Sequence, residues 1–73
     1  MKIKAKIVYL KDDTIYLKNG IFFSDDISRF VEGDLEGTIE VFFYDGSSVV
    51  IFDEFDEFNK IITDQDKFWP SAN

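Results

Sequence analysis

The chain of 73 residues contains no cysteine and no histidine, and it has one arginine, one proline and one tryptophan. Without cysteine it forms no disulfide, and without cysteine and histidine it cannot build the common structural zinc sites. The nucleophile–base pairs that depend on those two residue types are excluded as well. We therefore expect no enzyme, no cofactor and no metal site, and stability that comes from packing alone.

Long apolar runs are also missing. No charge-free apolar stretch approaches the roughly 20 residues that a membrane-spanning helix needs, and the first residues alternate charged and apolar side chains, which is not the pattern of a signal or transit peptide. These features predict a soluble, cytoplasmic protein. The length predicts one domain over residues 1–63, followed by a tail over 64–73 that is partly ordered through Phe68-Trp69.

What the chain does have is aromatic side chains and acid. It contains nine phenylalanines and three tyrosines, which must supply the core or be covered by a partner. Residues 1–18 hold five lysines and two aspartates, a balance of +3, whereas residues 19–73 hold three basic and 13 acidic residues, a balance of −10. A body that negative repels nucleic acid and acidic membranes and attracts basic protein surfaces.

The N-terminal segment alternates apolar and polar residues, which predicts β-strands. Asp12-Asp13 indicates a first turn, and Asn19-Gly20 is the pair that a type I′ hairpin favours. We therefore expect a three-strand antiparallel meander over residues 2–23. Ser24 is predicted to cap a short helical turn that extends to Val31, because apolar residues follow it at helical spacing.

The second half predicts a hairpin over residues 38–52 that turns at Asp45-Gly46, and then a helix over about 53–62 that Asp53 caps. Asp56 is expected to complete a capping box with Asp53, and the apolar face of this helix, formed by Phe55, Phe58, Ile61 and Ile62, is expected to cover the sheet. The predicted fold class is α+β, with about five antiparallel strands that curl into a half-barrel and a C-terminal helix packed on one face. A closed five-stranded barrel with the helix at one end is the alternative.

Two acidic groups are candidate binding sites. If the chain is extended from residue 32 to residue 40, four carboxylates project from one side of it at a spacing of about 7 Å, like a row of phosphates. These residues are Glu32, Asp34, Glu36 and Glu40. The second group lies in the first turns of the predicted helix and exceeds what capping requires; it comprises Asp53, Glu54, Asp56 and Glu57. For both groups the ordinary alternative is a solvated surface or helix capping.

Lysines and aromatics supply two further features. Lys2, Lys4 and Lys6 line one face of the first strand, where they would protect a sheet edge or meet the acidic body of another copy. Adjacent aromatic residues on strands face opposite sides, so one ring of each pair should point outward. The expected outward patch comprises Tyr16, Phe22, Phe42 and Tyr44, of which Phe42 and Tyr44 would be anchors between the two acidic groups.

The first functional hypothesis is a non-enzymatic acidic protein-binding module. It would act as an inhibitor or regulator that docks its carboxylates on a basic surface of another protein. In the sharper form that surface binds nucleic acid, and the protein acts as a DNA mimic in the manner of viral or mobile-element antagonists. It would bind neither nucleic acid nor membrane directly. The second hypothesis is a structural or regulatory homo-oligomer that buries the lysine face and the aromatic patch. The third is a small-ligand-binding half-barrel.

Overall fold

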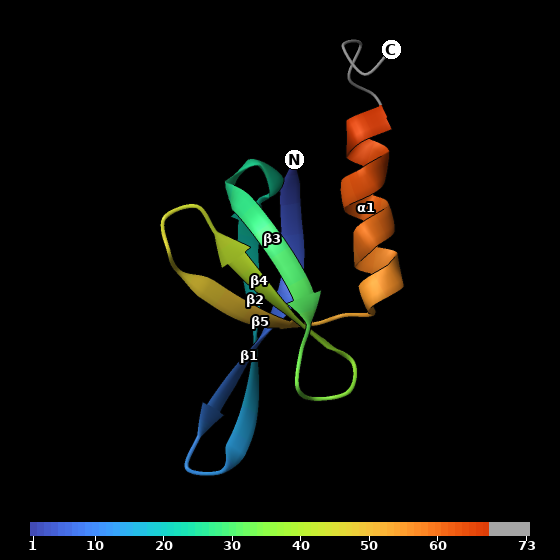
Figure 1. Ribbon diagram of the computed structural model, residues 1–73. Coiled ribbons are helices and arrows are strands. Elements are labelled where there is room, and N and C mark those ends of the chain that lie inside the picture. Colours follow the sequence, from blue (N-terminus) through green and yellow to red (C-terminus); the bar gives the residue numbers. More distant parts are fainter. Residues whose placement is uncertain (68–73) are drawn as a thin grey trace.

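The computed structural model describes residues 1–67, of which 64–67 are described by their backbone (Figure 1). It consists of five strands, a short 3-10 helix and one α-helix, so the predicted α+β class with five antiparallel strands and a C-terminal helix is confirmed. The elements are β1 (Lys2–Lys11), β2 (Thr14–Phe23), η1 (Ser24–Asp26), β3 (Ile27–Glu32), β4 (Thr38–Phe43), β5 (Ser48–Phe52) and α1 (Phe55–Lys67).

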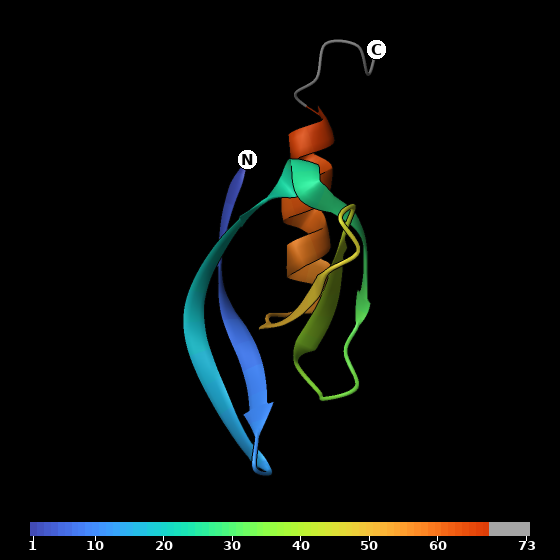
Figure 2. The same ribbon diagram turned by 90° about the vertical axis from the view of Figure 1, so that its left-hand side faces the viewer.

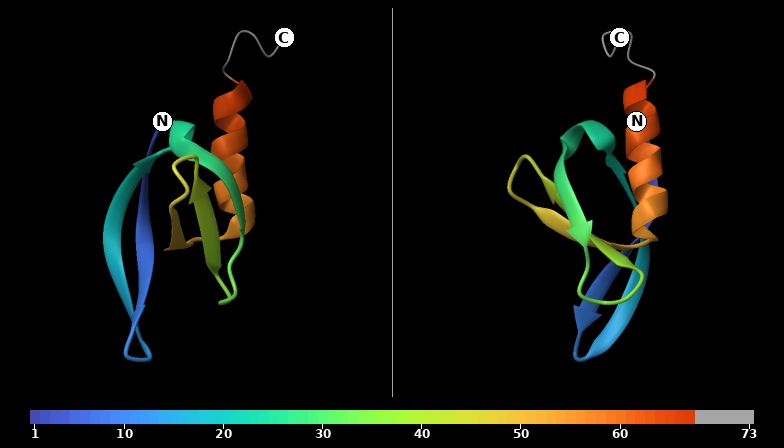
Figure 3. Two further views of the ribbon diagram at one scale, coloured as in Figure 1. Left: turned by 60° about the vertical axis from the view of Figure 1, so that its left-hand side comes forward. Right: turned by 45° about the vertical axis from the view of Figure 1, so that its right-hand side comes forward.

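The strands form one antiparallel sheet in the order β2-β1-β5-β4-β3, which stays open (Figure 2). The long β1–β2 hairpin joins the β3–β4–β5 meander at only two residue pairs, Lys6 with Phe52 and Ile7 with Ile51. Residues 8–17, here called the arm, therefore project beyond the rest of the sheet. The arm and α1 extend in opposite directions, and the molecule measures 49 × 24 × 18 Å (Figures 1 and 3).

The predicted three-strand meander over residues 2–23 is wrong in one respect, because the chain does not turn at Asn19-Gly20. β2 runs straight through both residues and pairs with β1 along its whole length. The tight turn lies at Asp12 and Asp13, whose φ angles of 51° and 62° are those of a type I′ loop. This turn allows ten consecutive cross-strand pairs, whereas a turn at Asn19-Gly20 would leave a third strand of only three residues.

The helical turn predicted to extend to Val31 is also wrong. Only Ser24–Asp26 form a 3-10 turn, and the chain then enters β3. Ile27 and Phe30 both pack against the core although they are three residues apart. A β-bulge explains this, since the register of β3 on β4 shifts between Ile27 and Arg29. The extra residue gives a strand the spacing that is typical of a helix.

The β4–β5 turn forms at the predicted Asp45-Gly46. Gly46 has a φ of 92° and its N–H donates to the carbonyl oxygen of Phe43 at 3.1 Å. The Asp45 carboxylate accepts hydrogen bonds from the hydroxyl and, at 2.8 Å, the backbone N–H of Ser47. These bonds favour the ionised form and lower the pKa of Asp45 from its ordinary value, the Ser47 hydroxyl contributing most.

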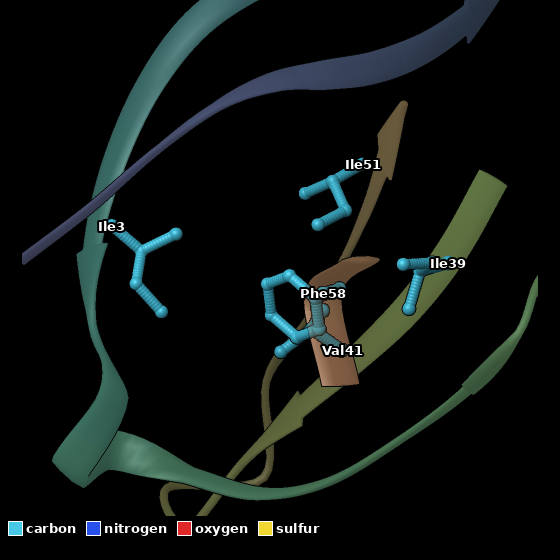
Figure 4. Packing of buried hydrophobic residues seen from close by; sticks show 5 residues of the cluster. All are labelled: Ile3, Ile39, Val41, Ile51 and Phe58. Carbon is cyan, nitrogen blue, oxygen red and sulfur yellow. The ribbon is translucent and has the colours of Figure 1, made fainter. Parts of the chain in front are cut away.

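The core lies between the sheet and α1. Residues directly opposite one another in neighbouring strands share a face of the sheet. The face that α1 covers is called the inner face, and it carries the buried side chains of the strands. Those side chains and the helix residue that seals them are Ile3, Ile39, Val41, Ile51 and Phe58 (Figure 4). Phe58 is fully buried and stacks edge-on against Phe30 with ring centroids 4.9 Å apart. The other side of the sheet is called the outer face.

Helix α1 begins at Phe55 and continues to Lys67, so residues 64–67 of the expected tail are helical. Phe55, Phe58 and Ile62 pack on the core as predicted, whereas Ile61 is 42% exposed. The expected capping box of Asp53 with Asp56 is replaced by a simpler contact, in which the Asp53 carboxylate accepts the N–H of Glu54 at 2.8 Å. The expected ordering through Phe68-Trp69 lies outside the described residues.

Candidate acidic binding site

The predicted straight row of carboxylates does not form, because the chain reverses between Glu32 and Glu40. Residues 33–37 make a tight loop that is closed by the N–H of Gly33 on the carbonyl oxygen of Thr38, at 2.8 Å. Glu32 lies opposite Ile39 and Glu40 lies opposite Val31. Since Ile39 is a core residue, Glu32 is on the inner face and Glu40 on the outer face. The row would have required an extended chain through Gly33 and Gly37.

The structure instead brings members of the two predicted acidic groups together. The N–H of Asp53 donates to the carbonyl oxygen of Gly37 at 3.0 Å, which fastens the start of the helix to the β3–β4 loop. A concavity of about 250 Å³ results between these segments. The four carboxylates that line it are here called the acidic cluster: Glu32, Asp53, Glu54 and Asp56.

The acidic cluster faces solvent. Glu32, Glu54 and Asp56 are exposed and Asp53 is half-buried. Among the residues whose side chains the structure describes, no lysine or arginine lines the concavity, whose other walls are Gly37, Thr38 and Phe55. Four negative charges therefore share one small surface with no cation among its walls, and this surface attracts positive charge. Of the other predicted residues, Glu36 is exposed in the loop and Glu57 is exposed on α1.

A second hollow lies between the β3–β4 loop and the arm, and is here called the outer groove. It has a volume of about 470 Å³. Its walls include the apolar residues Val8, Leu10, Ile15, Leu35 and Val50 and three carboxylates, Asp13, Asp34 and Glu40. Sequence reasoning missed this groove, and with it the part played by Asp13, because no local pattern relates the arm to a loop twenty residues later. Thr38 lines both hollows, so acid surrounds the loop on both sides.

The predicted aromatic anchors do not lie between the acidic groups. Phe42 and Tyr44 are at the far end of β4 from the β3–β4 loop (Figure 1). Tyr44 is 76% exposed, and Phe42 is half-buried beneath the guanidinium of Arg29, 4.2 Å from the ring centroid. For the adjacent rings of Phe22 and Phe23 the prediction is reversed. Phe22, which was expected to point outward, packs against Phe43, while Phe23 is exposed. Tyr16 is exposed on the arm, as expected.

Edge protection is wrong for Lys6, which pairs with Phe52 of β5. β1 lies between β2 and β5, but Lys2 and Lys4 precede the two positions at which it pairs with β5, so edge protection by these two stays a prediction. All three lysines are on the outer face. Lys4 and Lys6 line a hollow of about 580 Å³ together with Ile21 and Phe52. Asp53 of the acidic cluster also lines this hollow, so Lys4 and Lys6 lie beside the cluster, across Asp53 from its concavity.

Residues 1–67 contain no group of three or more acidic side chains arranged to hold a metal ion. Within the same residues, α1 is too short and too polar to cross a membrane. The chain matches no protein-family model, and neither curated proteins nor solved structures show a significant likeness to it. The acidic cluster and the outer groove are therefore the features of this structure that bear on function.

Proposed function

We propose that this protein is a non-enzymatic binding module that docks its acidic cluster on a basic surface of another protein, as an inhibitor or regulator. The observation that carries the proposal is the acidic cluster, in which Glu32 from β3 meets three carboxylates around the start of α1 at one concavity whose described walls include no basic residue. Two stretches of chain that are about twenty residues apart contribute to it.

The outer groove adds a second requirement on the partner. Apolar walls with carboxylates at the rim suit a segment that presents lysine or arginine beside an aliphatic or aromatic side chain. The charged contacts would accelerate association and set its dependence on salt, and the apolar anchor would supply contact area. A partner that offers only positive charge would bind more weakly and would be lost at lower salt.

A basic probe of defined sequence tests the proposal. The probe is a fluorescent peptide of alternating lysine and leucine residues, with a glutamate-for-lysine peptide as the negative control, measured by anisotropy at about 50 and 300 mM salt. Wild-type protein is expected to bind the lysine peptide and to lose affinity steeply with salt. The variant Glu32→Lys/Glu54→Lys should bind at least about tenfold more weakly.

The matched control is Asp25→Lys/Asp26→Lys, which changes the net charge by the same amount. These two residues lie in η1, at the end of the sheet away from the β3–β4 loop (Figure 1). The control should retain most of the affinity. An equal loss in both variants would show that net charge, and not the acidic cluster, controls binding, and would contradict the proposal.

The sharper form of the proposal is a basic partner whose surface binds nucleic acid. A competition experiment tests this form. Duplex DNA should displace the protein from such a partner, whereas unrelated anionic polymers of lower charge density should not. Because the straight carboxylate row does not form, the resemblance of this surface to DNA depends on the charge density of the acidic cluster. The cytoplasmic location expected from the sequence stays a prediction.

The small-ligand hypothesis has less support. The inner side of the half-open sheet, where a ligand would bind, is filled by the core side chains and sealed by Phe58. A homo-oligomer has independent support in the edge strand β2, through a different surface from the lysine face and aromatic patch expected from the sequence.

A further inference from the structure

Strand β2 forms one edge of the sheet and is unusually unprotected. It is ten residues long and contains no proline, and its only charged residue is Lys18. Edge strands are normally guarded by several charges, by proline or by an early bulge. Figure 2 shows β2 as the outermost strand, on the side away from α1. Its outer face carries Ile15, Leu17, Ile21 and Phe23, each about half exposed.

The backbone groups that face the free edge belong to the odd-numbered residues of β2. In a two-residue hairpin loop the flanking pair, Lys11 and Thr14, is hydrogen-bonded, and bonded pairs then alternate along the ladder. The even-numbered residues of β2 therefore bond to β1. The N–H of Ser24 follows the same alternation, since it donates to the carbonyl oxygen of Met1 at 2.8 Å. This leaves the N–H and C=O groups of residues 15, 17, 19, 21 and 23 directed outward.

We propose that two copies of this protein pair through β2, antiparallel and about a two-fold axis at Asn19, to form one continuous sheet of ten strands. In this register residue 19 faces its own copy, Leu17 faces Ile21 and Ile15 faces Phe23. All five outward-directed residues of each strand then lie in bonded pairs, and every edge N–H of one copy meets a C=O of the other.

Side-chain chemistry favours this register over the one whose axis lies one residue earlier. A two-fold axis one residue earlier would stack Lys18 on Lys18 of the partner copy, and like charges opposite one another destabilise a sheet. That axis would also leave Phe23 without a paired residue in the other strand. With the axis at Asn19, Lys18 lies across from Gly20, and the outer face gains aliphatic and aromatic cross-strand pairs, which stabilise sheets.

The apolar surface and the charge of the edge favour such a dimer. The four apolar residues of the outer face and Tyr16 are each about half exposed, and pairing covers the flanks of these side chains in addition to the backbone groups of both edges. Residues 1–23 carry five lysines and two aspartates, so the edge lies in the least negative part of a chain of charge −7. The acidic cluster lies outside the paired strands, so the dimer does not depend on the proposed binding function, although Ile15 belongs both to the dimer contact and to the outer groove.

Sedimentation of the full chain at micromolar concentration tests the pairing. Wild-type protein of 8.5 kDa should sediment with twice that mass. Leu17→Lys should give a monomer, because the new lysine lies opposite Ile21. The double variant Leu17→Lys/Ile21→Glu should restore the dimer, since each lysine then meets a glutamate. The control Leu10→Lys makes the same change on the outer face of β1 and should remain dimeric. A monomeric wild type, or a dimeric Leu17→Lys, overturns the proposal.

Disulfide formation tests the register, and the chain has no cysteine to interfere. Asn19→Cys should give a covalent dimer on mild oxidation, because bonded antiparallel pairs have Cα atoms about 5.5 Å apart, within disulfide reach. Lys18→Cys should cross-link poorly, because the two copies of residue 18 are diagonal neighbours about 7–8 Å apart. The reverse result would place the axis at residue 18 and would overturn the register.

Discussion

The side chain of Ile7 occupies the space above Gly20, on the neighbouring strand of the β1–β2 hairpin. A Cβ at Gly20 would collide with the Cδ1 and Cγ1 atoms of Ile7. Ile7 in turn packs against the core and pairs with Ile51 of β5, at the junction that joins the hairpin to the rest of the sheet. Gly20 is therefore a strand residue whose lack of a side chain lets Ile7 reach that junction.

Gly20→Ala should lower the free energy of unfolding by about 1–3 kcal/mol, the usual cost of adding a methyl group to a packed site. Urea denaturation measures this loss. Ile7→Val removes the Cδ1 atom that the new methyl group meets, so the double variant should lose less than the sum of the two single losses. Strictly additive losses would show that Ile7 and Gly20 are not coupled.

The Asp12-Asp13 turn should tolerate a better turn sequence. Both residues adopt positive φ angles, which asparagine and glycine adopt more readily than aspartate. Asp12→Asn/Asp13→Gly should therefore raise the free energy of unfolding by about 1 kcal/mol. The control Asp12→Asn/Asp13→Asn makes the same change of charge without glycine and should give a smaller gain. A loss of stability in the glycine variant would contradict the type I′ assignment.

Phe58 should be the most costly helix residue to truncate. It is fully buried and contacts the ring of Phe30, so Phe58→Ala should destabilise the fold by about 3–5 kcal/mol. Small domains have only about 5–15 kcal/mol of stability, and thermal unfolding followed by circular dichroism should show a much lower midpoint or no transition. Ile61→Ala, at a position that is 42% exposed, is the matched control and should cost far less.

Asp45 should titrate below its ordinary pKa of 3.8 because Ser47 bonds its ionised form. A lowered pKa in the folded state stabilises the fold above the unfolded pKa, and this contribution disappears as the pH falls through the folded value. Ser47→Ala removes the hydroxyl bond, so the pKa of Asp45 should rise toward 3.8 in an NMR titration. An unchanged pKa would show that the backbone bond alone sets it. The effect on stability should be small, since Asp45 is fully exposed.

The sequence by itself determined the local features of this fold. Alternation predicted strands, and Asp45-Gly46 predicted a turn that forms. Apolar spacing predicted the buried face of the helix at three of its four residues, all but Ile61. The charge imbalance and the missing cysteine and histidine are also properties of the sequence alone. In each case the cause lies within a few residues of its effect, so one sequence is enough to see it.

Only the tertiary structure decided the rest. Asn19-Gly20 has the chemistry of a turn, but the ten-pair ladder of β1 and β2 holds it in a strand, and the bulge in β3 gives a strand helical spacing. The position of β1 inside the sheet and the meeting of Glu32 with the start of α1 depend on strand order. Strand order arises from contacts between distant segments, and their energy is not encoded in any one segment.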